Sequence, residues 1–385
     1  MRPGGDTARM PSHPSSSASP LRSPSSSGRG LGPAGIVLIL SGPPSAQPGE
    51  GEGEERADAA TVARAEARGE LVRLRAGVHV ERRAWEAVSA LERHLLRIRA
   101  LARVATTPVV LGGASAAAVH GLPRIAPWPG LVTLLDVPGA APGRRAGTRI
   151  VRDPAQGRSR LVPIVSGVRA PGLAAAALAA SHDAAMQAVR GAAPRGPGWY
   201  AHGLVPLDAA LGAGRRTGSG CTRAELERER VLRGTGPGSR RAEELVASAD
   251  GAAASAVESI ARGIAHESGL APPEVAPHVP GHGRVALAWP RERVALRIRG
   301  SSGRVAPGDL AEADGPGGPP SAVEGWCVVE AAERDVLGAG RLRALLLHAG
   351  LEPGRRAAHA GGSGGRGASA ADRSRRSPPL GCGGE

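Results

Sequence analysis

Regular alternation of apolar and polar residues begins at about residue 57. Residues 57–68 predict a short helix that Gly69 ends, since glycine commonly closes a helix in the left-handed conformation. In residues 71–80, Leu and Val alternate with Arg, and Gly77 interrupts the pattern. This period of two around a glycine predicts a β-hairpin with a basic outward face. A helix followed by a basic hairpin is how a winged helix-turn-helix ends.

One long amphipathic helix is predicted next. Its apolar residues recur at spacings of three or four and form one stripe, made of Trp85, Val88, Leu91, Leu95, Ile98 and Leu101. Beyond it, short apolar runs separated by Gly and Pro predict strands at 109–111, 131–135 and 161–165, with a helix at 115–120. The Ala-rich residues 173–189 predict a further helix.

The remaining pattern predicts an α/β module. Residues 222–225 read Thr-Arg-Ala-Glu, a capping box that predicts a helix start, and the pattern indicates further helices at 240–249 and 255–268. Residues 284–289 and 293–299 predict a hairpin with Pro290 in its turn. A strand at 326–329 and a helix at 341–348 follow a loop rich in Gly and Pro.

The predicted fold class is therefore α/β (α+β). We expect a winged-helix remnant over residues 35–83, a mixed α/β middle region over 84–250 and a C-terminal module over 251–352. Residues 1–34 are mostly Ser, Pro, Gly and Arg, and residues 353–385 carry six Arg against two acids. Both tails are expected to be disordered, because they have little apolar surface to bury.

Arginine dominates the charge. All 49 basic residues are Arg, against 35 Asp and Glu, so the net charge is +14. This balance favours an anionic partner, with DNA the first candidate. GC-rich codons also enrich Arg by themselves, so a compositional origin of the charge stays open. The absence of Lys excludes a P-loop lysine and a Schiff base, and the absence of Asn excludes N-glycosylation.

The cysteines and the apolar runs bear on the cellular compartment of the chain. The cysteines Cys221, Cys327 and Cys382 form no CxxC pair, so neither a zinc site nor a disulfide framework is indicated, and a reducing cytoplasm fits. The longest strongly apolar run, residues 36–40, is far shorter than the ~20 residues of a membrane span. No motif indicates a cofactor, a bound metal or a small-molecule substrate. We expect no membrane partner.

Several blocks in the same order and spacing resemble a known family. They are residues 69–78 (GELVRLRAGV), 115–123 (SAAAVHGLP), 208–211 with 222–226, 249–251 leading to 258–259, 284–285 with 289–290, and 325–326 with 335–336. Across residues 57–352 the chain is similar to AbiEi-type antitoxins and transcriptional regulators of bacteria. The resemblance implies an N-terminal winged helix-turn-helix. It also implies a C-terminal domain with the fold of very-short-patch-repair endonucleases, a branch of the PD-(D/E)XK nucleases. In that family the antitoxin represses its own operon and opposes a nucleotidyltransferase-like toxin encoded nearby.

The chain departs from this family at two places. Nuclease-like members carry one Asp on the first strand of the C-terminal hairpin, and a Glu and an Asp two apart on the second, which hold a divalent metal. The corresponding residues here are Ala286, Arg297 and Arg299, and only the helix residue Glu258 remains. Because arginine repels a metal ion, the resemblance implies a nuclease fold without catalytic residues. Residues 41–56 are mostly Gly, Pro and Glu where the family has helix-turn-helix sequence, so that module is degenerate.

The remaining candidate site residues are better explained by structural roles than by metal binding or catalysis. His278 and His282 have metal-ligand spacing but lie among Pro and Gly, which predicts a loop. Residues 234–238 (GTGPG) predict a linker, and His120 is expected to end a helix. Cys221 is expected to be an inert thiol because no histidine is near it in the sequence.

The leading functional prediction is a cytoplasmic DNA-binding regulator or antitoxin, with a toxin encoded nearby as a possible protein partner. Its expected phosphate contacts are Arg64, Arg68, Arg73, Arg75, Arg82 and Arg83. One alternative is a metal-dependent DNA endonuclease in which Glu330 and Asp335 join Glu258. A second alternative is a decayed, non-functional member of the family.

Overall fold

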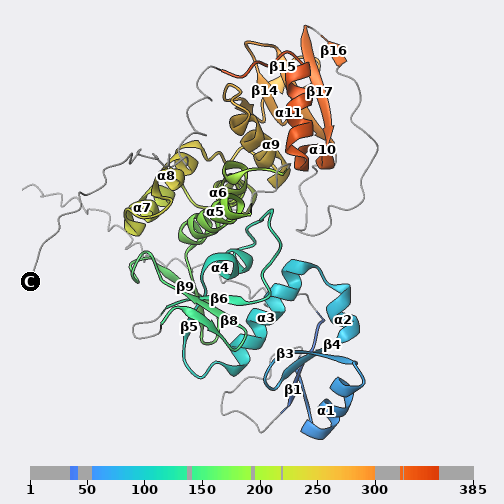
Figure 1. Cartoon of the computed structure of the whole chain (residues 1–385), viewed down its shortest axis with the longest axis vertical. Helices are drawn as coiled ribbons and strands as arrows, with labels where there is room; N and C mark the ends of the chain where they lie inside the picture. Colours follow the sequence, from blue (N-terminus) through green and yellow to red (C-terminus); the bar gives the residue numbers. More distant parts are fainter. Residues whose placement is uncertain are drawn as a thin grey trace, which may run out of the picture.

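The chain is a mixed α/β protein in which helices pack against several small sheets (Figure 1). The computed structural model describes residues 35–41, 54–136, 141–191, 196–217, 220–299, 321–323 and 325–354. The tail predicted at 1–34, and all but two residues of the tail predicted at 353–385, lie outside these ranges. None of the helices in the described ranges combines the length and apolarity that crossing a lipid bilayer demands.

The N-terminal unit is a four-stranded sheet with one exposed helix. Its elements are β1 (Leu38–Ser41), β2 (Glu54–Ala57), α1 (Ala59–Ala67), β3 (Leu71–Arg75) and β4 (Val78–Glu81). The strand order is β2-β1-β4-β3, in which β3 and β4 form the predicted hairpin. The prediction of a helix followed by a hairpin is confirmed. Strands β1 and β2 were not predicted, because their pairing partners lie far along the chain.

The amphipathic stripe after the hairpin belongs to two helices, so the prediction of one continuous helix was wrong. Helix α2 (Arg82–Ala87) carries Trp85, and helix α3 (Ala90–Val104) carries the apolar positions from Leu91 onward. Ser89 separates the two helices. Its hydroxyl accepts a hydrogen bond from the Glu92 amide, and the Glu92 carboxylate accepts one from the Ser89 amide, forming a capping box.

The middle region combines two three-stranded sheets with a layer of helices. Its strands are β5 (Val109–Val110), β6 (Val132–Leu135), β7 (Gly143–Arg145), β8 (Thr148–Val151), β9 (Leu161–Val165) and β10 (Val168–Pro171), and they form the sheets β5-β10-β9 and β6-β8-β7. Its helices are α4 (Gly113–Val119), α5 (Leu173–Arg190), α6 (Trp199–Thr217), α7 (Arg223–Arg233) and α8 (Ser239–Ser248). The strands expected near 109, 131 and 161 are confirmed, and so are the helices α4, α5, α7 and α8.

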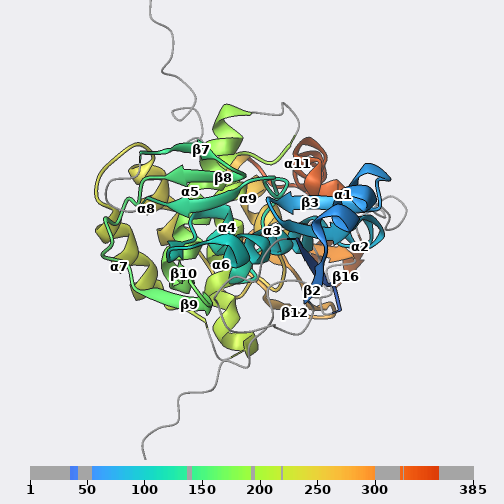
Figure 2. The same ribbon diagram turned by 90° about the horizontal axis from the view of Figure 1, so that it is seen from below.

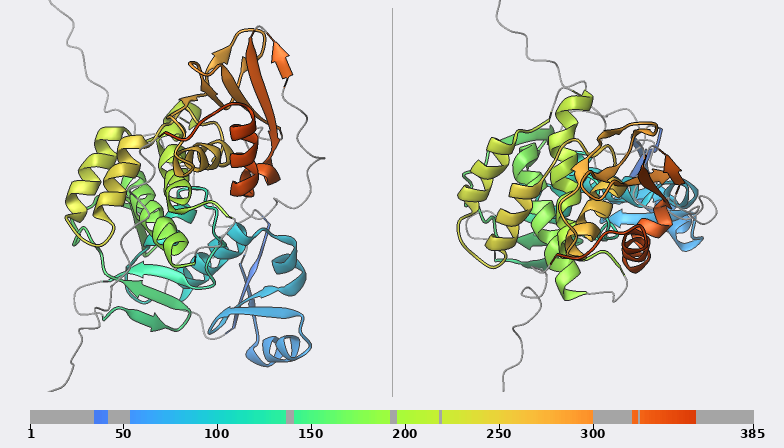
Figure 3. Two further views of the ribbon diagram at one scale, coloured as in Figure 1. Left: turned by 45° about the horizontal axis from the view of Figure 1, so that its top comes forward. Right: turned by 90° about the horizontal axis from the view of Figure 1, so that it is seen from above.

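The C-terminal region contains a mixed five-stranded sheet with helices on one face (Figure 3). Helix α9 (Ala256–Glu267) precedes the strands β11 (Glu274–Val275), β12 (His278–Val279), β13 (Gly283–Arg284), β14 (Leu287–Trp289), β15 (Val294–Arg299), β16 (Ser321–Val323) and β17 (Trp326–Ala332), and helices α10 (Glu333–Leu337) and α11 (Ala339–His348) follow. The sheet order is β11-β14-β15-β17-β16, with β14 antiparallel and β17 parallel to β15. The predicted hairpin, strand and final helix are therefore confirmed.

Two helices connect neighbouring hydrophobic cores. Leu96 of α3 is buried against the N-terminal sheet, whereas Ile98 of the same helix belongs to the core of the middle region. Figure 2 shows α3 running between the two regions. Helix α6 acts in the same way, because Leu204 packs in the middle core and Val205 in the C-terminal core. The three cores are thus joined by continuous helices as well as by the chain between them.

A buried ion pair ties α6 to α9. Both carboxylate oxygens of Asp208 lie 2.6 Å from Nη2 of Arg262. Asp208 also accepts a hydrogen bond of 2.8 Å from the Asp250 amide. Removing one partner of such a pair would leave an uncompensated charge in the interior, so the pair fixes how these helices meet.

Candidate nucleic-acid interface

Helix α1 is fixed in place by its capped N-terminus and by one buried residue. The Asp58 carboxylate accepts a hydrogen bond of 3.1 Å from the Thr61 amide and caps the first turn. Val62 is the one buried residue of the helix, so most of its surface faces solvent. Gly69 ends the connection to β3 with φ of +75°, a conformation that suits glycine. The result is an exposed helix joined by a tight turn to the basic hairpin.

Three of the six predicted phosphate-contacting arginines are exposed and make no ion pair with the described residues. Arg64 lies along α1, where its Nε donates to the Ala60 carbonyl at 3.2 Å and its Nη2 to Thr61 Oγ1 at 3.2 Å. Arg73 on β3 and Arg83 on α2 are exposed. Neither has a hydrogen bond or ion pair with any part of the chain that the structure describes. These guanidinium groups can reach a phosphate without first breaking an ion pair.

Two more of these arginines are exposed but already paired. Arg68 makes a bidentate contact with Glu70, at 2.7 and 2.9 Å, which raises the pKa of Arg68 and lowers that of Glu70. Arg82 donates to the Gly69 carbonyl and lies 3.7 Å from the Glu86 carboxylate. A phosphate would have to compete with these partners, so Arg68 and Arg82 are weaker candidates.

Arg75 is turned away from the exposed face of the hairpin. Its Nη1 donates a hydrogen bond of 2.8 Å to the Ala146 carbonyl, in the turn between β7 and β8. The guanidinium is partly buried there, and burial lowers its pKa. A β-bulge between Arg73 and Arg75 redirects this part of β3. Arg75 therefore connects the hairpin to the middle region rather than presenting its charge to solvent.

Glu258, the carboxylate that the resemblance marks as a remnant, is held at the start of a helix that Ser255 caps. It lies in the first turn of α9, and its amide donates to Ser255 Oγ at 3.2 Å. The buried carboxylate accepts a hydrogen bond of 2.8 Å from the Ala254 amide and lies 3.7 Å from Nη2 of Arg284. Ala286, the second marked position, is buried and offers no ligand atom.

Arg297 and Arg299 lie on the same face of β15, as their spacing of two residues predicts. The face also holds Glu330 of β17, which is directly opposite Arg297 in the parallel register. The Glu330 carboxylate lies 3.7 Å from Arg297 and 3.9 Å from Arg299. Arg297 also donates to the His282 carbonyl. Two guanidinium groups thus surround the carboxylate that the endonuclease alternative assigns to a metal.

Asp335, the other carboxylate of that alternative, has a structural role. It is fully buried, accepts a hydrogen bond of 3.0 Å from the Ala332 amide and pairs with Arg341 Nε at 2.8 Å. It therefore caps α10. Within the described ranges, no three His, Cys, Asp or Glu side chains gather as metal ligands would.

The isolated candidates also have ordinary surroundings. His120 ends α4 as predicted, although its Nε2 bonds the Pro171 carbonyl at 2.7 Å rather than a carbonyl of its own helix. Burial raises the pKa of Cys221 to about 11, which disfavours the reactive thiolate and agrees with the prediction of an inert thiol. His278 lies in the short strand β12 rather than in a loop, and His282 follows in the turn after it.

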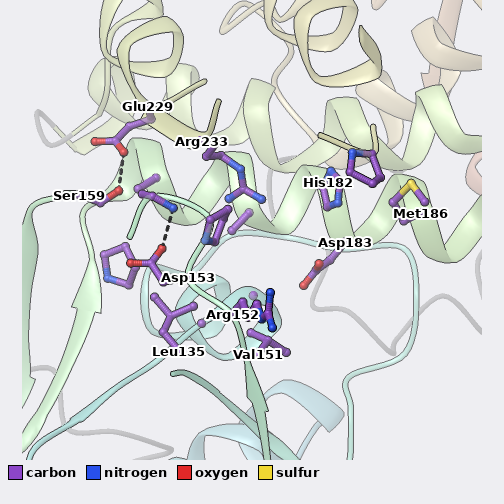
Figure 4. Close-up of a pocket in the computed structure, with 18 of the residues that line it drawn as sticks. Leu135, Val151, Arg152, Asp153, Ser159, His182, Asp183, Met186, Glu229 and Arg233 are labelled. Atoms are coloured by element: carbon purple, nitrogen blue, oxygen red, sulfur yellow. Dashed lines mark hydrogen bonds between the residues drawn. The ribbon is translucent and has the colours of Figure 1, made fainter. Parts of the chain in front are cut away.

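The sequence analysis missed a cavity of about 370 Å³ in the middle region. Its walls come mainly from the turn before α4, strand β8 with the loop after it, helix α5 and the end of α7 (Figure 4), with single residues from the ends of β6 and β10 and from the loop after α7. No local motif could indicate it, because the lining residues are spread between residues 112 and 237. The sequence feature that comes nearest to indicating the cavity is the Gly112-Gly113 pair. Gly113 has a φ of +45°, and a side chain there would collide with the Asp183 carboxylate.

No protein-family model matches this chain. Two curated relatives are the uncharacterized proteins MT2308 and Rv2248 of Mycobacterium tuberculosis, from strains CDC 1551 / Oshkosh and ATCC 25618 / H37Rv. Each is 33% identical over 141 residues, which cover 33% of this chain and 50% of the relative. The chain therefore spans about half the length of the curated relatives it matches. No solved structure matches it, so the geometry above carries the functional argument.

Proposed function

We propose that this chain is a cytoplasmic DNA-binding regulator or antitoxin of the AbiEi type, which contacts DNA through α1 and the hairpin of β3 and β4. The observation that carries the proposal is the exposed helix α1 leading directly into a basic hairpin, with Arg64, Arg73 and Arg83 available around it. Guanidinium groups on such a surface replace the counterions of the DNA phosphates, and the released ions favour binding.

The proposed contacts divide into two kinds. Arg64, Arg73 and Arg83 would supply the electrostatic affinity. The exposed face of α1 would lie against the edges of the bases, as a recognition helix does in the major groove. Arg68 and Arg82 would add contacts only where the phosphate displaces Glu70 or Glu86.

The test of this proposal is binding to the DNA upstream of the chain's own gene. A regulator that represses its own operon should bind this fragment more tightly than a fragment of equal length and base composition from elsewhere. We expect a gel-shift assay at moderate salt to show that preference, and replacement of Arg64 by Ala to weaken binding to both fragments. If the unchanged protein binds neither fragment detectably, the proposal is refuted.

We propose in addition that the C-terminal region has a nuclease-like fold without nuclease activity. Support comes from the order of α9, the β14–β15 hairpin and the parallel strand β17 beside β15. Support for inactivity comes from the carboxylates, each of which already has a partner. Glu258 bonds the Ala254 amide, Asp335 caps α10, and Glu330 lies between two arginines. Metal-assisted hydrolysis needs carboxylates free to hold the ion that activates water.

We therefore expect the purified chain to leave supercoiled plasmid intact in the presence of Mg²⁺ or Mn²⁺. The matched control is Glu258→Ala, prepared in the same way, because a contaminating nuclease would cut equally in both samples. Nicking that needs metal and disappears in Glu258→Ala would contradict the proposal and establish the endonuclease alternative.

A further inference from the structure

The cavity of the middle region has an apolar interior with a few buried charges. Its volume of about 370 Å³ falls in the ~300–1,000 Å³ range of small-molecule sites. The apolar wall lies between the ends of β6 and β8 and helix α5, and is supplied by Leu135, Val151, Ala175, Ala179 and Met186. Figure 4 shows Asp183 of α5 and Arg233 of α7 pointing into the space between these walls.

Asp183 and Arg233 face this cavity without a hydrogen-bond partner of their own in the part of the chain that the structure describes. Neither has a hydrogen bond or an ion pair within 4.0 Å among the described residues. Both side chains are half-buried, and burial raises the pKa of Asp183 and lowers that of Arg233, while the opposite charges of the two groups attract each other. Two oppositely charged groups that face one cavity without a hydrogen bond to the described residues are both available to bond a ligand there.

The other acids of the cavity are already occupied. Asp153 accepts hydrogen bonds from the amides of Ala155 and Gly157, at 3.0 and 2.7 Å. Glu229 accepts one of 2.7 Å from the Ser159 hydroxyl. Asp183 is therefore the carboxylate left to receive hydrogen-bond donors from a ligand.

Three further arginines line the cavity at exposed positions. Arg149 and Arg152 come from β8 and the residue after it, and Arg190 ends α5. None of the three has a hydrogen bond or ion pair with the described chain. Their exposure places them where the cavity meets solvent, and several guanidinium groups around one opening suit a phosphate. The interior of the cavity therefore offers Asp183 to hydrogen-bond donors of a ligand, and its opening offers three arginines to an anionic group.

We propose that this cavity binds a purine nucleoside monophosphate whose base carries an amino group next to a ring N–H, as guanine does. The two donors of that edge would pair with the two oxygens of Asp183. The acceptors on the opposite side of the base would face Arg233, the pairing that arginine makes with guanine in DNA. The phosphate would lie among Arg149, Arg152 and Arg190. This site is separate from the proposed DNA surface and does not depend on DNA binding.

The experiment is a calorimetric titration of the full chain with GMP, IMP, AMP and inorganic phosphate. IMP lacks only the amino group of the guanine edge, and AMP reverses the donor pattern. We expect GMP to bind most tightly, IMP more weakly, and phosphate alone weakest. Asp183→Asn should weaken GMP binding roughly tenfold to hundredfold, because it replaces a charged acceptor with a mixed donor and acceptor. Glu243→Gln, which changes an exposed carboxylate of α8, should leave GMP binding unchanged.

A thermal melt of each variant separates binding from folding. Because burial disfavours the charged form of Asp183 in the empty cavity, Asp183→Asn should raise the melting temperature without ligand and reduce the rise that GMP produces in the unchanged chain. Failure of millimolar GMP to bind would overturn the proposal. So would equal affinity for IMP and GMP, or for phosphate alone and GMP. Each of these outcomes is independent of whether the chain binds DNA.

Discussion

At the scale of single residues, His94 shows how a polar side chain is fixed in the interior. It is fully buried on α3, and its Nδ1 lies 2.9 Å from the Pro129 carbonyl, so Nδ1 must carry the hydrogen. Nε2 then accepts a hydrogen bond of 2.9 Å from the Ser115 hydroxyl, and Ser115 Oγ accepts one of 2.8 Å from the Thr133 amide. This chain of bonds joins α3, α4 and β6 and requires a neutral imidazole.

Burial lowers the pKa of His94 to about 4, and this predicts a loss of stability in acid. Since the unfolded histidine has a pKa of ~6.5, the unfolded state binds more protons as the pH falls from there. The contribution of His94 is complete above about pH 6.5 and is lost towards about pH 4, by up to ~3 kcal/mol. Urea unfolding at about pH 7 and about pH 4.5 measures it. His94→Gln should be less stable at pH 7 but lose less on acidification; an identical loss would show that His94 is not responsible.

The arginines show why residue type alone could not define the DNA surface. The alternation of Leu and Val with Arg correctly placed Arg73 and Arg75 on one hairpin strand. It could not reveal the β-bulge between them, or the Ala146 carbonyl that Arg75 reaches from 71 positions away in the sequence. In the same way, the cavity around Asp183 depends on segments that only the fold brings together.

At the scale of elements, the sequence predicted the helices whose caps and apolar stripes lie within the helix itself. The capping box at Thr222 marked the start of α7, and the apolar stripe located most of α3. Helix α6 escaped prediction because Gly203 and Pro206 both disfavour a helix. Its tertiary contacts explain Gly203, since a side chain there would collide with Leu245 of α8. Packing against neighbours outweighs propensity at this position.

The crossing of α6 and α9 depends on Gly263, and this makes a second prediction. A Cβ at Gly263 would meet the Ala201 backbone and lie 2.6 Å from the Ala201 Cβ. Gly263→Ala should therefore destabilise the chain by about 1–3 kcal/mol, although Ala is the better helix former. Gly340→Ala on α11 is the control, because nothing lies within 4 Å of its added Cβ. If both variants melt at or above the temperature of the unchanged chain, the close crossing is wrong.

At the scale of the whole molecule, the contact between Arg75 and Ala146 joins the N-terminal unit to the hairpin that lines the cavity. The hairpin of β7 and β8 receives Arg75 at its turn, and the same β8 supplies Arg149 and Val151 to the cavity lining. The β7–β8 hairpin therefore contacts the N-terminal unit at its turn and lines the cavity along β8. The C-terminal region joins this arrangement through α6 and the buried Asp208–Arg262 pair.

The central claim is that α1 and its hairpin bind DNA through phosphate contacts, and the salt dependence of binding tests it most directly. Fluorescence anisotropy of a labelled duplex over a range of salt concentrations gives the slope of log affinity against log salt. Each phosphate neutralised contributes about −0.9 to that slope. Arg73→Ala should therefore make it shallower by about 0.9, whereas Arg75→Ala should leave the slope unchanged, because that guanidinium bonds the Ala146 carbonyl. Equal slopes for the unchanged chain and Arg73→Ala, or no binding by the unchanged chain at low salt, would contradict the claim.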